Sequence, residues 1–439
     1  MNQNVPVKIS FWSAVLMSIN IIVGAGIYFN PGPMAAIAGG FSFLGWILVG
    51  LVLYPIIWSL SQAVQVFPGE GGFYNYCKTG INDTAGFLAN WAYILGYTGT
   101  AGVYCLFIKD LLVKQAGLTF IHEYSVLVNV VLIGIFLLLN LIKVDLIAKL
   151  QSAAAIVKVI PLVFVIAVCA FYFGPHVTYV SSDIANLGYT LPVAIFAFFG
   201  FETCCSMSGM IEGGAKAAGR VIIAAFLISM VLYTLFHIGL TYIMGVDQLA
   251  QFGPVGFPKF LGFGESITSI MQSMIAFFII FSACNAFYGV SSMNIGNIFC
   301  LAKKNVLFGS SSLSKTNANQ RPIMAILVYG LGLFGLVTFI PNMLVMTALT
   351  GLGICSAFTM TVVALMLTFF KKQDYVRFAM SIIALVSCAI FLYFSWMLIG
   401  QDNMTRLMNA SPVLVGALVG FAMYKVQTGC CSIGKQPGK

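Results

Sequence analysis

Long apolar stretches separated by short polar segments recur along the whole chain. A helix needs roughly 20 apolar residues to cross the hydrocarbon core of a bilayer, and the stretches are of about that length. Since lipid offers no hydrogen-bond partner to an open backbone, each stretch is predicted to be a membrane helix. The predicted helices cover residues 11–38, 41–66, 85–113, 125–142, 150–173, 188–208, 220–246, 266–301, 322–341, 343–370, 376–399 and 408–426.

This pattern predicts an all-α integral membrane protein with about twelve transmembrane helices. Runs such as Val130–Leu139 are apolar on every side, whereas the strands of a membrane β-barrel alternate apolar and polar residues. We expect one transmembrane domain over residues 1–426, followed by a cytoplasmic tail over residues 427–439.

Composition and charge agree with a membrane location. Hydrophobic residues make up 60% of the 439 residues and charged residues only 8%, a balance that would leave a water-soluble domain with large exposed apolar patches. Of the 21 Lys and Arg residues, sixteen fall on the side of the N-terminus and four on the other side. Positive loops stay in the cytoplasm, so both termini are predicted to be cytoplasmic in a multi-pass protein of the inner or plasma membrane. The net charge of +9 then reflects topology, and we expect no nucleic-acid partner.

The first predicted helix contains a break. Its sequence places Gly24, Ala25 and Gly26 near membrane depth, and Pro31 and Gly32 follow them. Unwinding there would expose backbone N–H and C=O groups, which membrane proteins tolerate only where they line a cavity or meet a ligand. A simple kink at Pro31 is the alternative explanation.

The sixth predicted helix repeats this feature, because Gly200 and Glu202 interrupt an otherwise apolar run. Two interrupted helices five spans apart are typical of an inverted repeat, in which the broken ends form a site near the bilayer midplane. The N-terminal end of a half-helix favours a carboxylate, whereas bare carbonyls suit an ammonium group. An amino acid carries both groups.

Several motifs together resemble the amino acid–polyamine–organocation (APC) superfamily of permeases, over most of the chain. The motifs are Gly24-Ala25-Gly26-Ile27, the loop from Pro68 to Tyr76 with Gly86 to Trp91 after it, Phe196 to Glu202 with Glu212 downstream, and Asn297 to Lys303. The segment after Glu212 lacks the prolines usual in the superfamily.

The resemblance implies a leucine-transporter-like fold, with two inverted five-helix repeats over about 11–173 and 188–370 and two extra helices over about 376–426. It also implies a role for each residue of the site. Around Gly24, the amides of Ala25, Gly26 and Ile27 would hold the substrate carboxylate, and carbonyls of Phe196, Ala197 and Phe199, next to Gly200, would take the amino group. Phe196 matches an aromatic gate, and Glu202 matches a glutamate that couples gating or proton movement.

Two ionisable residues lie inside predicted spans. Glu202 is the one mid-span acid, where an ionised carboxylate costs roughly 2.5–3.5 kcal/mol; the alternative to a coupling role is a neutral carboxyl bonded to backbone near Gly200. Lys158 resembles a lysine of proton-coupled members of the superfamily, with snorkelling to the cytoplasmic face as its alternative. Ser291 and Ser292 could instead line a sodium site.

These observations favour a secondary active transporter that works by alternating access around the unwound first and sixth helices. We expect proton-coupled symport of amino acids, with an amino acid/amine (polyamine) exchanger or a sodium-coupled symporter as alternatives. An enzyme is not expected, because the three histidines are far apart and catalytic groups do not cluster. The cysteines have no zinc spacing, so we expect no metal and no cofactor beyond a coupling proton or sodium ion. The expected partners are a small-molecule substrate (an amino acid or related amine) and the lipid bilayer, and the oligomeric state stays open.

Overall fold

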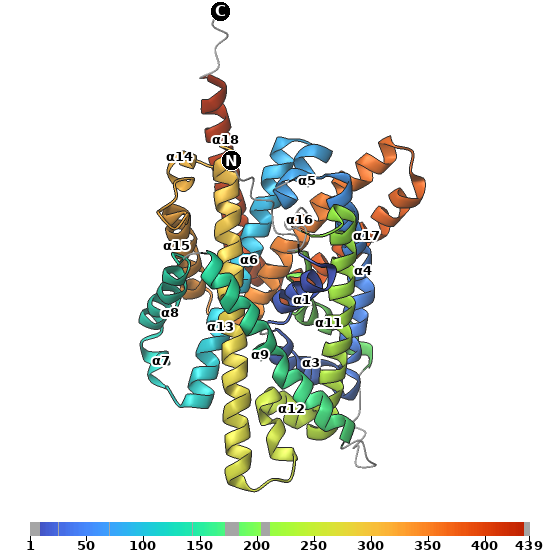
Figure 1. The fold of residues 1–439 in the computed structure, drawn as a ribbon, viewed down its shortest axis with the longest axis vertical. Coiled ribbons are helices and arrows are strands. Elements are labelled where there is room, and N and C mark those ends of the chain that lie inside the picture. Colours follow the sequence, from blue (N-terminus) through green and yellow to red (C-terminus); the bar gives the residue numbers. More distant parts are fainter. Residues whose placement is uncertain are drawn as a thin grey trace, which may run out of the picture. The chain divides into compact units, whose positions relative to one another are not determined.

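The computed structural model describes residues 9–24, 26–69, 71–142, 144–171, 184–202 and 211–433 (Figure 1). Within these ranges the chain consists of helices joined by short turns, with no strand and one isolated backbone bridge between Ile9 and Ile211. The all-α fold predicted from the sequence is therefore confirmed.

The chain divides into two compact units. Unit 1 comprises Met1–Pro68, Phe107–Leu118 and Lys149–Ala286, and unit 2 comprises Gly69–Leu106, Thr119–Ala148 and Phe287–Lys439. The elements of unit 1 are α1 (Phe11–Ile22), α2 (Gly26–Phe29), α3 (Pro31–Ala38), η1 (Gly39–Phe41), α4 (Leu44–Val66), η2 (Ile184–Thr190), α10 (Leu191–Phe196), α11 (Gly214–Met244), α12 (Val246–Phe252) and η5 (Gly253–Phe260). The elements of unit 2 are α5 (Gly72–Gly80), α7 (Phe120–Glu123), α8 (Ser125–Leu139), α14 (Ser310–Leu313), α15 (Ile323–Phe339), α16 (Met343–Lys371), α17 (Tyr375–Leu398) and α18 (Asn403–Ile433). Three long helices contribute to both units: α6 (Asp83–Ala116), α9 (Val144–Phe171) and α13 (Glu265–Lys303).

Seven helices of the described chain are long and apolar enough to cross a membrane. Shorter apolar helices cover Phe11–Ile22, Ser125–Leu139, Val157–Phe171, Ile184–Phe196 and Ile323–Phe339. Two of these short helices, Phe11–Ile22 and Ile184–Phe196, belong to the first and sixth predicted spans, which the sequence predicts to be interrupted. The exact number of twelve spans stays a prediction.

Unit 1 is built around the packing of α4 and α1 against α11. Small residues allow the first pair to approach closely, since a Cβ on Gly219 of α11 would lie 3.1 Å from the carbonyl oxygen of Ser61 on α4. Close approach through small residues is how membrane helices associate, because lipid provides no hydrophobic force to drive them together. Helix α11 therefore lies next to both α1 and α4, and it is the scaffold on which the first interrupted helix rests.

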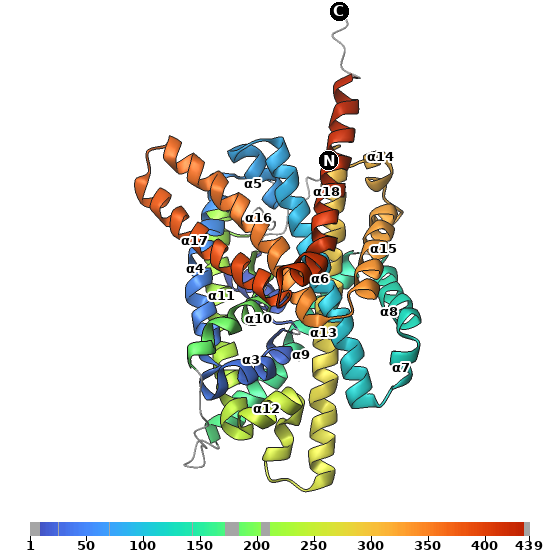
Figure 2. The ribbon, with the colours of Figure 1, turned by 180° about the vertical axis from the view of Figure 1, so that it is seen from behind.

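In unit 2, α16 and α17 form a hairpin (Figures 1 and 2). The carboxylate of Asp374 caps α17 by accepting from the amide of Arg377, and Gln373 makes the tight turn with φ of 58°. Helix α6 crosses α16 where both have glycine: a Cβ on Gly96 would lie 2.7 Å from the amide nitrogen of Ile354. Helix α18 is attached through the Trp91 indole, which donates to the carbonyl of Gly416 at 2.8 Å.

Candidate functional site in unit 1

The first span is interrupted between α1 and α2, as the glycines predict. Helix α1 ends at Ile22, the amide of Val23 closes its last turn on Ile19, and the next helical turn begins at Gly26. From there the hydrogen bonds continue along the chain, with the amide of Asn30 on the carbonyl of Gly26 and the amide of Met34 on that of Asn30. The result is two half-helices. The last carbonyls of α1 and the first amides from Gly26 onward consequently lack the bonds of a continuous helix.

The sixth span is interrupted after α10. The helix ends at Phe196, residues 197–200 form a turn, and Gly200 has φ of +117°, a backbone conformation that favours glycine. The segment is buried throughout, with Phe196 and Ala197 3% exposed and Phe199 5%. Residues 203–210, which follow Glu202, lie outside the described residues.

The two interruptions meet. A Cβ on Gly26 would lie 2.7 Å from the Cα of Ala197, and a Cβ on Gly200 would lie 2.8 Å from Cγ2 of Ile21. Because each glycine lacks a side chain, the backbone segments around Gly26 and Gly200 can approach each other closely. The structure brings together predicted site residues that are more than 160 positions apart in the sequence.

One turn further along, the same two segments are joined by Asn30. Its Nδ2 donates to the carbonyl of Val193 on α10 at 2.7 Å, and its side chain is fully buried. Asn30 follows Gly26 by four residues and Val193 precedes Ala197 by four. The contact at Gly26 and this hydrogen bond are therefore successive steps of one interface between α2 and α10.

Lys158 on α9 is bonded to both halves of the first span. Its Nζ donates to the carbonyl of Asn20 near the end of α1 at 3.0 Å, and its own carbonyl accepts from the Tyr28 hydroxyl on α2 at 2.6 Å. An ammonium suits this position, because the C-terminal end of a helix carries partial negative charge and lacks backbone donors. Lys158 is 2% exposed and its ammonium points to α1, an arrangement unlike a snorkelling side chain.

Tyr233 on α11 is a site residue that the sequence analysis missed. Its hydroxyl lies 2.9 Å from the carbonyl oxygen of Ile22 and 3.0 Å from that of Ala197, and its single proton is shared between these two acceptors. It thereby serves a carbonyl at the end of α1 and another just after α10. A tyrosine in an apolar helix gives no signal of this in the sequence; the only available clue is that buried tyrosine hydroxyls need a partner.

Glu202 lies next to the second interruption, with 1% exposure. One carboxyl oxygen accepts from the amide of Gly200 at 3.1 Å. This is the backbone bond expected of a structural carboxyl, and it also keeps the acid within the interrupted segment.

Two hydrogen bonds hold His237 on α11. The Trp46 indole donates to its Nδ1 at 2.9 Å, and its Nε2 lies 3.1 Å from the Ser42 hydroxyl. Since the indole can only donate, Nδ1 is the acceptor, and Nε2 carries the proton that Ser42 accepts. These bonds make His237 a packing residue of unit 1.

Other predicted residues occupy different positions. Gly24 and Ile27 are buried on either side of Ala25, which itself lies outside the described residues. Ser291 belongs to unit 2, where its hydroxyl accepts from Tyr329 at 3.3 Å.

The loop motif that begins at Pro68 also belongs largely to unit 2. Lys78 on α5 forms an ion pair with Asp83 at 2.8 Å, and this hydrogen bond raises the pKa of Lys78. The ammonium of Lys304 lies 4.9 Å from the centre of the Tyr74 ring. This region therefore supplies cation–π and ionic contacts, and its described residues after Pro68 belong to unit 2 rather than to the unit that contains the interruptions.

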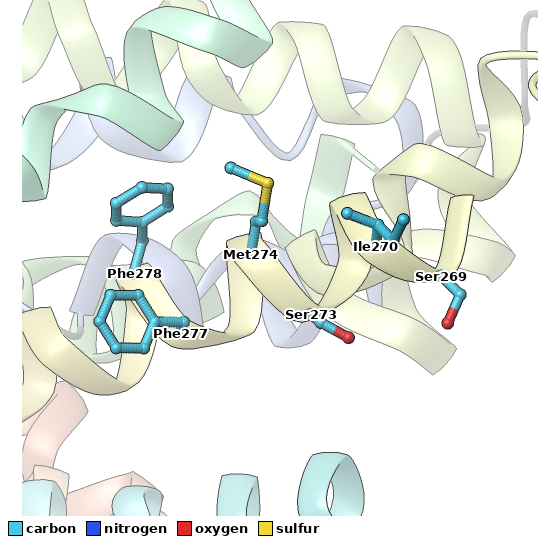
Figure 3. Close-up of a pocket in the computed structure, with 6 residues that line it drawn as sticks. All are labelled: Ser269, Ile270, Ser273, Met274, Phe277 and Phe278. Atoms are coloured by element: carbon cyan, nitrogen blue, oxygen red, sulfur yellow. The ribbon is translucent and has the colours of Figure 1, made fainter. Parts of the chain in front are cut away.

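A hollow of about 520 Å³ lies on α13 and differs from this site in its lining residues. It is lined by side chains of one helix, shown in Figure 3: Ser269, Ile270, Ser273, Met274, Phe277 and Phe278. Its largest residues are exposed, with Ile270 at 61% and Phe277 at 63%. Exposed apolar residues on a membrane-length helix suit contact with lipid, so we do not assign substrate to this hollow.

Taken together, the apolar helices and the paired interruptions are the features of a multi-pass membrane protein. Residues 9–419 match the family model described as amino acid permease, and the chain belongs to this family of membrane transporters. The resemblance to the APC superfamily is thereby confirmed, as is the expectation that the protein is not an enzyme.

The curated relatives are only distantly similar to this chain in sequence. The serine/threonine exchanger SteT of Bacillus subtilis is 22% identical over 252 residues, which cover 56% of this chain and 57% of SteT. Uncharacterized transporters of Mycobacterium bovis and Mycobacterium tuberculosis are 23% identical over 254 residues, covering 56% of this chain and 54% of each relative. The chain thus spans little more than half the length of these curated relatives.

Proposed function

We propose that the protein is a secondary active transporter that carries amino acids across the cell membrane by proton-coupled symport. The observation that carries this proposal is the contact between Gly26 and Ala197, which places two interrupted helices against each other inside one unit. Membrane helices are interrupted where the freed backbone groups line a cavity or bind a ligand.

The chemistry of the two segments supports an amino acid as the substrate. Amides at the start of the helical run from Gly26 favour the carboxylate, together with Gly24, Ala25 and Ile27. Carbonyls beyond the end of α10, at Phe196, Ala197 and Phe199, favour the ammonium group. Gly200 then keeps the second segment close enough to α1 for one small zwitterion to reach both sets of groups.

For the coupling step we propose that Lys158 exchanges a proton. When charged, its ammonium holds the carbonyl of Asn20; when neutral, it loses the electrostatic part of that bond. The protonation state of Lys158 would thereby change how firmly α1 is held beside α2. Glu202, bonded to Gly200, would respond in the second segment, and Phe196 would gate access.

The proposal extends to the arrangement of repeats along the chain and to the orientation of the termini. Residues 11–173 and 188–370 would form inverted repeats, residues 376–426 two further helices, and residues 427–439 a cytoplasmic tail, with both termini in the cytoplasm. The first two spans of each repeat, α1–α4 and α10–α11, fall in the same compact unit, which supports this correspondence. Alternating access would then move this unit around the substrate.

A second candidate function is exchange of one amino acid or amine for another. It is favoured by the similarity to SteT, whose name states that it exchanges serine and threonine. Sodium coupling through Ser291 and Ser292 has less support, because the Ser291 hydroxyl is engaged by Tyr329.

Uptake into proteoliposomes separates these functions. Purified protein is reconstituted and presented with a panel of labelled amino acids and amines, with a proton gradient, with a sodium gradient, or with unlabelled substrate inside. Symport predicts accumulation that needs the proton gradient and disappears with a protonophore. Uptake that needs only internal substrate supports exchange, and no uptake of any amino acid under any condition contradicts the proposal.

A further inference from the structure

Two polar side chains on α13, in the part of the helix that belongs to unit 1, have a distinct environment. The hydroxyl of Ser282 and both amide atoms of Asn285 are buried and have no hydrogen-bond partner among the described residues. Asn285 is the one carboxamide of the described chain for which both atoms are in this state. Neither residue is among those described above at the two interruptions, which lie in the same unit.

Such groups are costly to leave unpaired. A buried donor or acceptor without a partner loses its hydration and gains nothing in return, so nearly all buried polar groups in proteins are hydrogen-bonded. A serine hydroxyl can rotate to a carbonyl of its own helix, as Ser18 does toward Ala14. The Asn285 amide presents a donor and an acceptor at once, and this pair of groups needs a partner that can both accept and donate.

The position of the pair on α13 supports a role inside the protein. Ser282 is fully buried and lies on the same side of the helix as the buried residues Ile275 and Ile279. Asn285, 9% exposed, is one helical turn further along, and residues three apart on a helix are neighbours. Phe277, which is 63% exposed, lies on a different side of the helix from Ser282.

We infer that Ser282 and Asn285 recognise the substrate's side chain, and that the substrates are neutral amino acids with a hydroxyl or carboxamide group. This inference rests on the proposed transport of amino acids. A hydroxyl and a carboxamide each donate and accept a hydrogen bond, which matches the two amide atoms of Asn285. Ser282 and Asn285 carry no charge, so they would not offset the desolvation of an ionised side chain.

Isosteric substrate pairs provide the test. Threonine and valine have nearly the same shape, as do asparagine and leucine, and the members of each pair differ in hydrogen bonding. Proteoliposome uptake gives kcat/KM for all four amino acids. A site built to hydrogen-bond its substrate rejects an analogue that lacks the group, so threonine over valine and asparagine over leucine are each expected to be favoured at least about tenfold.

The variant Asn285→Leu is expected to bring both ratios close to one, and Ser282→Ala to lower the threonine/valine ratio by a smaller factor. Asn140→Leu is the matched control, because Asn140 is also buried but its Nδ2 already donates to the carbonyl of Phe136. This control is expected to keep the wild-type ratios. If Asn285→Leu does not fold, as judged by size-exclusion chromatography, Asn285→Ser replaces it and is expected to lower the asparagine/leucine ratio most.

Two results would overturn the inference: wild-type ratios near one, or unchanged ratios in the Asn285 variant. In both cases amino acids are still carried, so the proposed function stands while this inference fails. Failure of the proposed function is a different result, in which none of the four amino acids enters the vesicles.

Discussion

Gly26 and Ala197 lie so close together that a single methyl group on Gly26 would be 2.7 Å from the Cα of Ala197. Real Cβ atoms essentially never approach backbone at this distance, so any side chain at Gly26 must push the two interrupted segments apart. The geometry of the proposed substrate site therefore depends on the absence of one Cβ.

Replacing Gly26 with alanine is expected to lower the affinity for the amino acid at least about tenfold, because the amides of α2 would move away from the carbonyls after α10. Equilibrium binding of labelled substrate to purified protein measures this. Gly134→Ala is the control: Gly134 is also helical, but a Cβ there meets no atom within 4 Å. Wild-type affinity in Gly26→Ala would show that substrate does not bind at this contact.

Lys158→Ala is expected to abolish uptake driven by a proton gradient and to spare exchange. The variant removes the only group of this residue that can carry a proton, whereas the main-chain site remains. Accumulation and exchange are measured in the same vesicle preparation. Lys371→Ala, at the exposed end of α16, is the control and is expected to accumulate substrate normally. Unchanged proton-driven accumulation in Lys158→Ala would remove Lys158 from the coupling step.

Tyr233→Phe is expected to lower the free energy of unfolding by about 1–3 kcal/mol, because the carbonyls of Ile22 and Ala197 lose a buried donor. Thermal denaturation in detergent measures this loss as a lower Tm. The exposed Tyr393 supplies the control Tyr393→Phe, which is expected to leave Tm unchanged. Equal Tm values for both variants would mean that the Tyr233 hydroxyl does not hold the interruptions together.

Glu202→Gln separates the two roles considered for this residue. The glutamine oxygen can still accept from the amide of Gly200, so substrate binding is expected to persist. Glutamine cannot exchange a proton, so the dependence of uptake on external pH is expected to weaken. The experiment compares uptake rates between about pH 5 and pH 8 for the variant and the wild type. Identical profiles would leave Glu202 with a backbone-bonding role alone.

Much of the fold could be predicted from the sequence. The predicted span 266–301 became α13 (Glu265–Lys303), and the span 343–370 became α16 (Met343–Lys371), with ends that differ by at most two residues. The reason is physical, because lipid forces each apolar run to satisfy its backbone within one helix. The ends are fixed by local features such as the Asn342 side chain that caps α16.

The candidate site could be predicted from the sequence only in part. Gly26 and Gly200 mark the interruptions because glycine is the residue that permits them, and Lys158 and Glu202 are conspicuous as charges in apolar runs. Tyr233 left no such signal. Its importance comes from the packing of α11 against α1, a long-range contact that hydropathy and spacing do not encode.

The most direct measurement of the central claim is an experimental structure of the protein with a bound amino acid. We predict that the substrate carboxylate lies within about 3.2 Å of main-chain amides at Gly26 and Ile27, and that its ammonium faces carbonyls between Phe196 and Phe199. A substrate bound elsewhere, with continuous helices running through Gly26 and Gly200, would contradict the account.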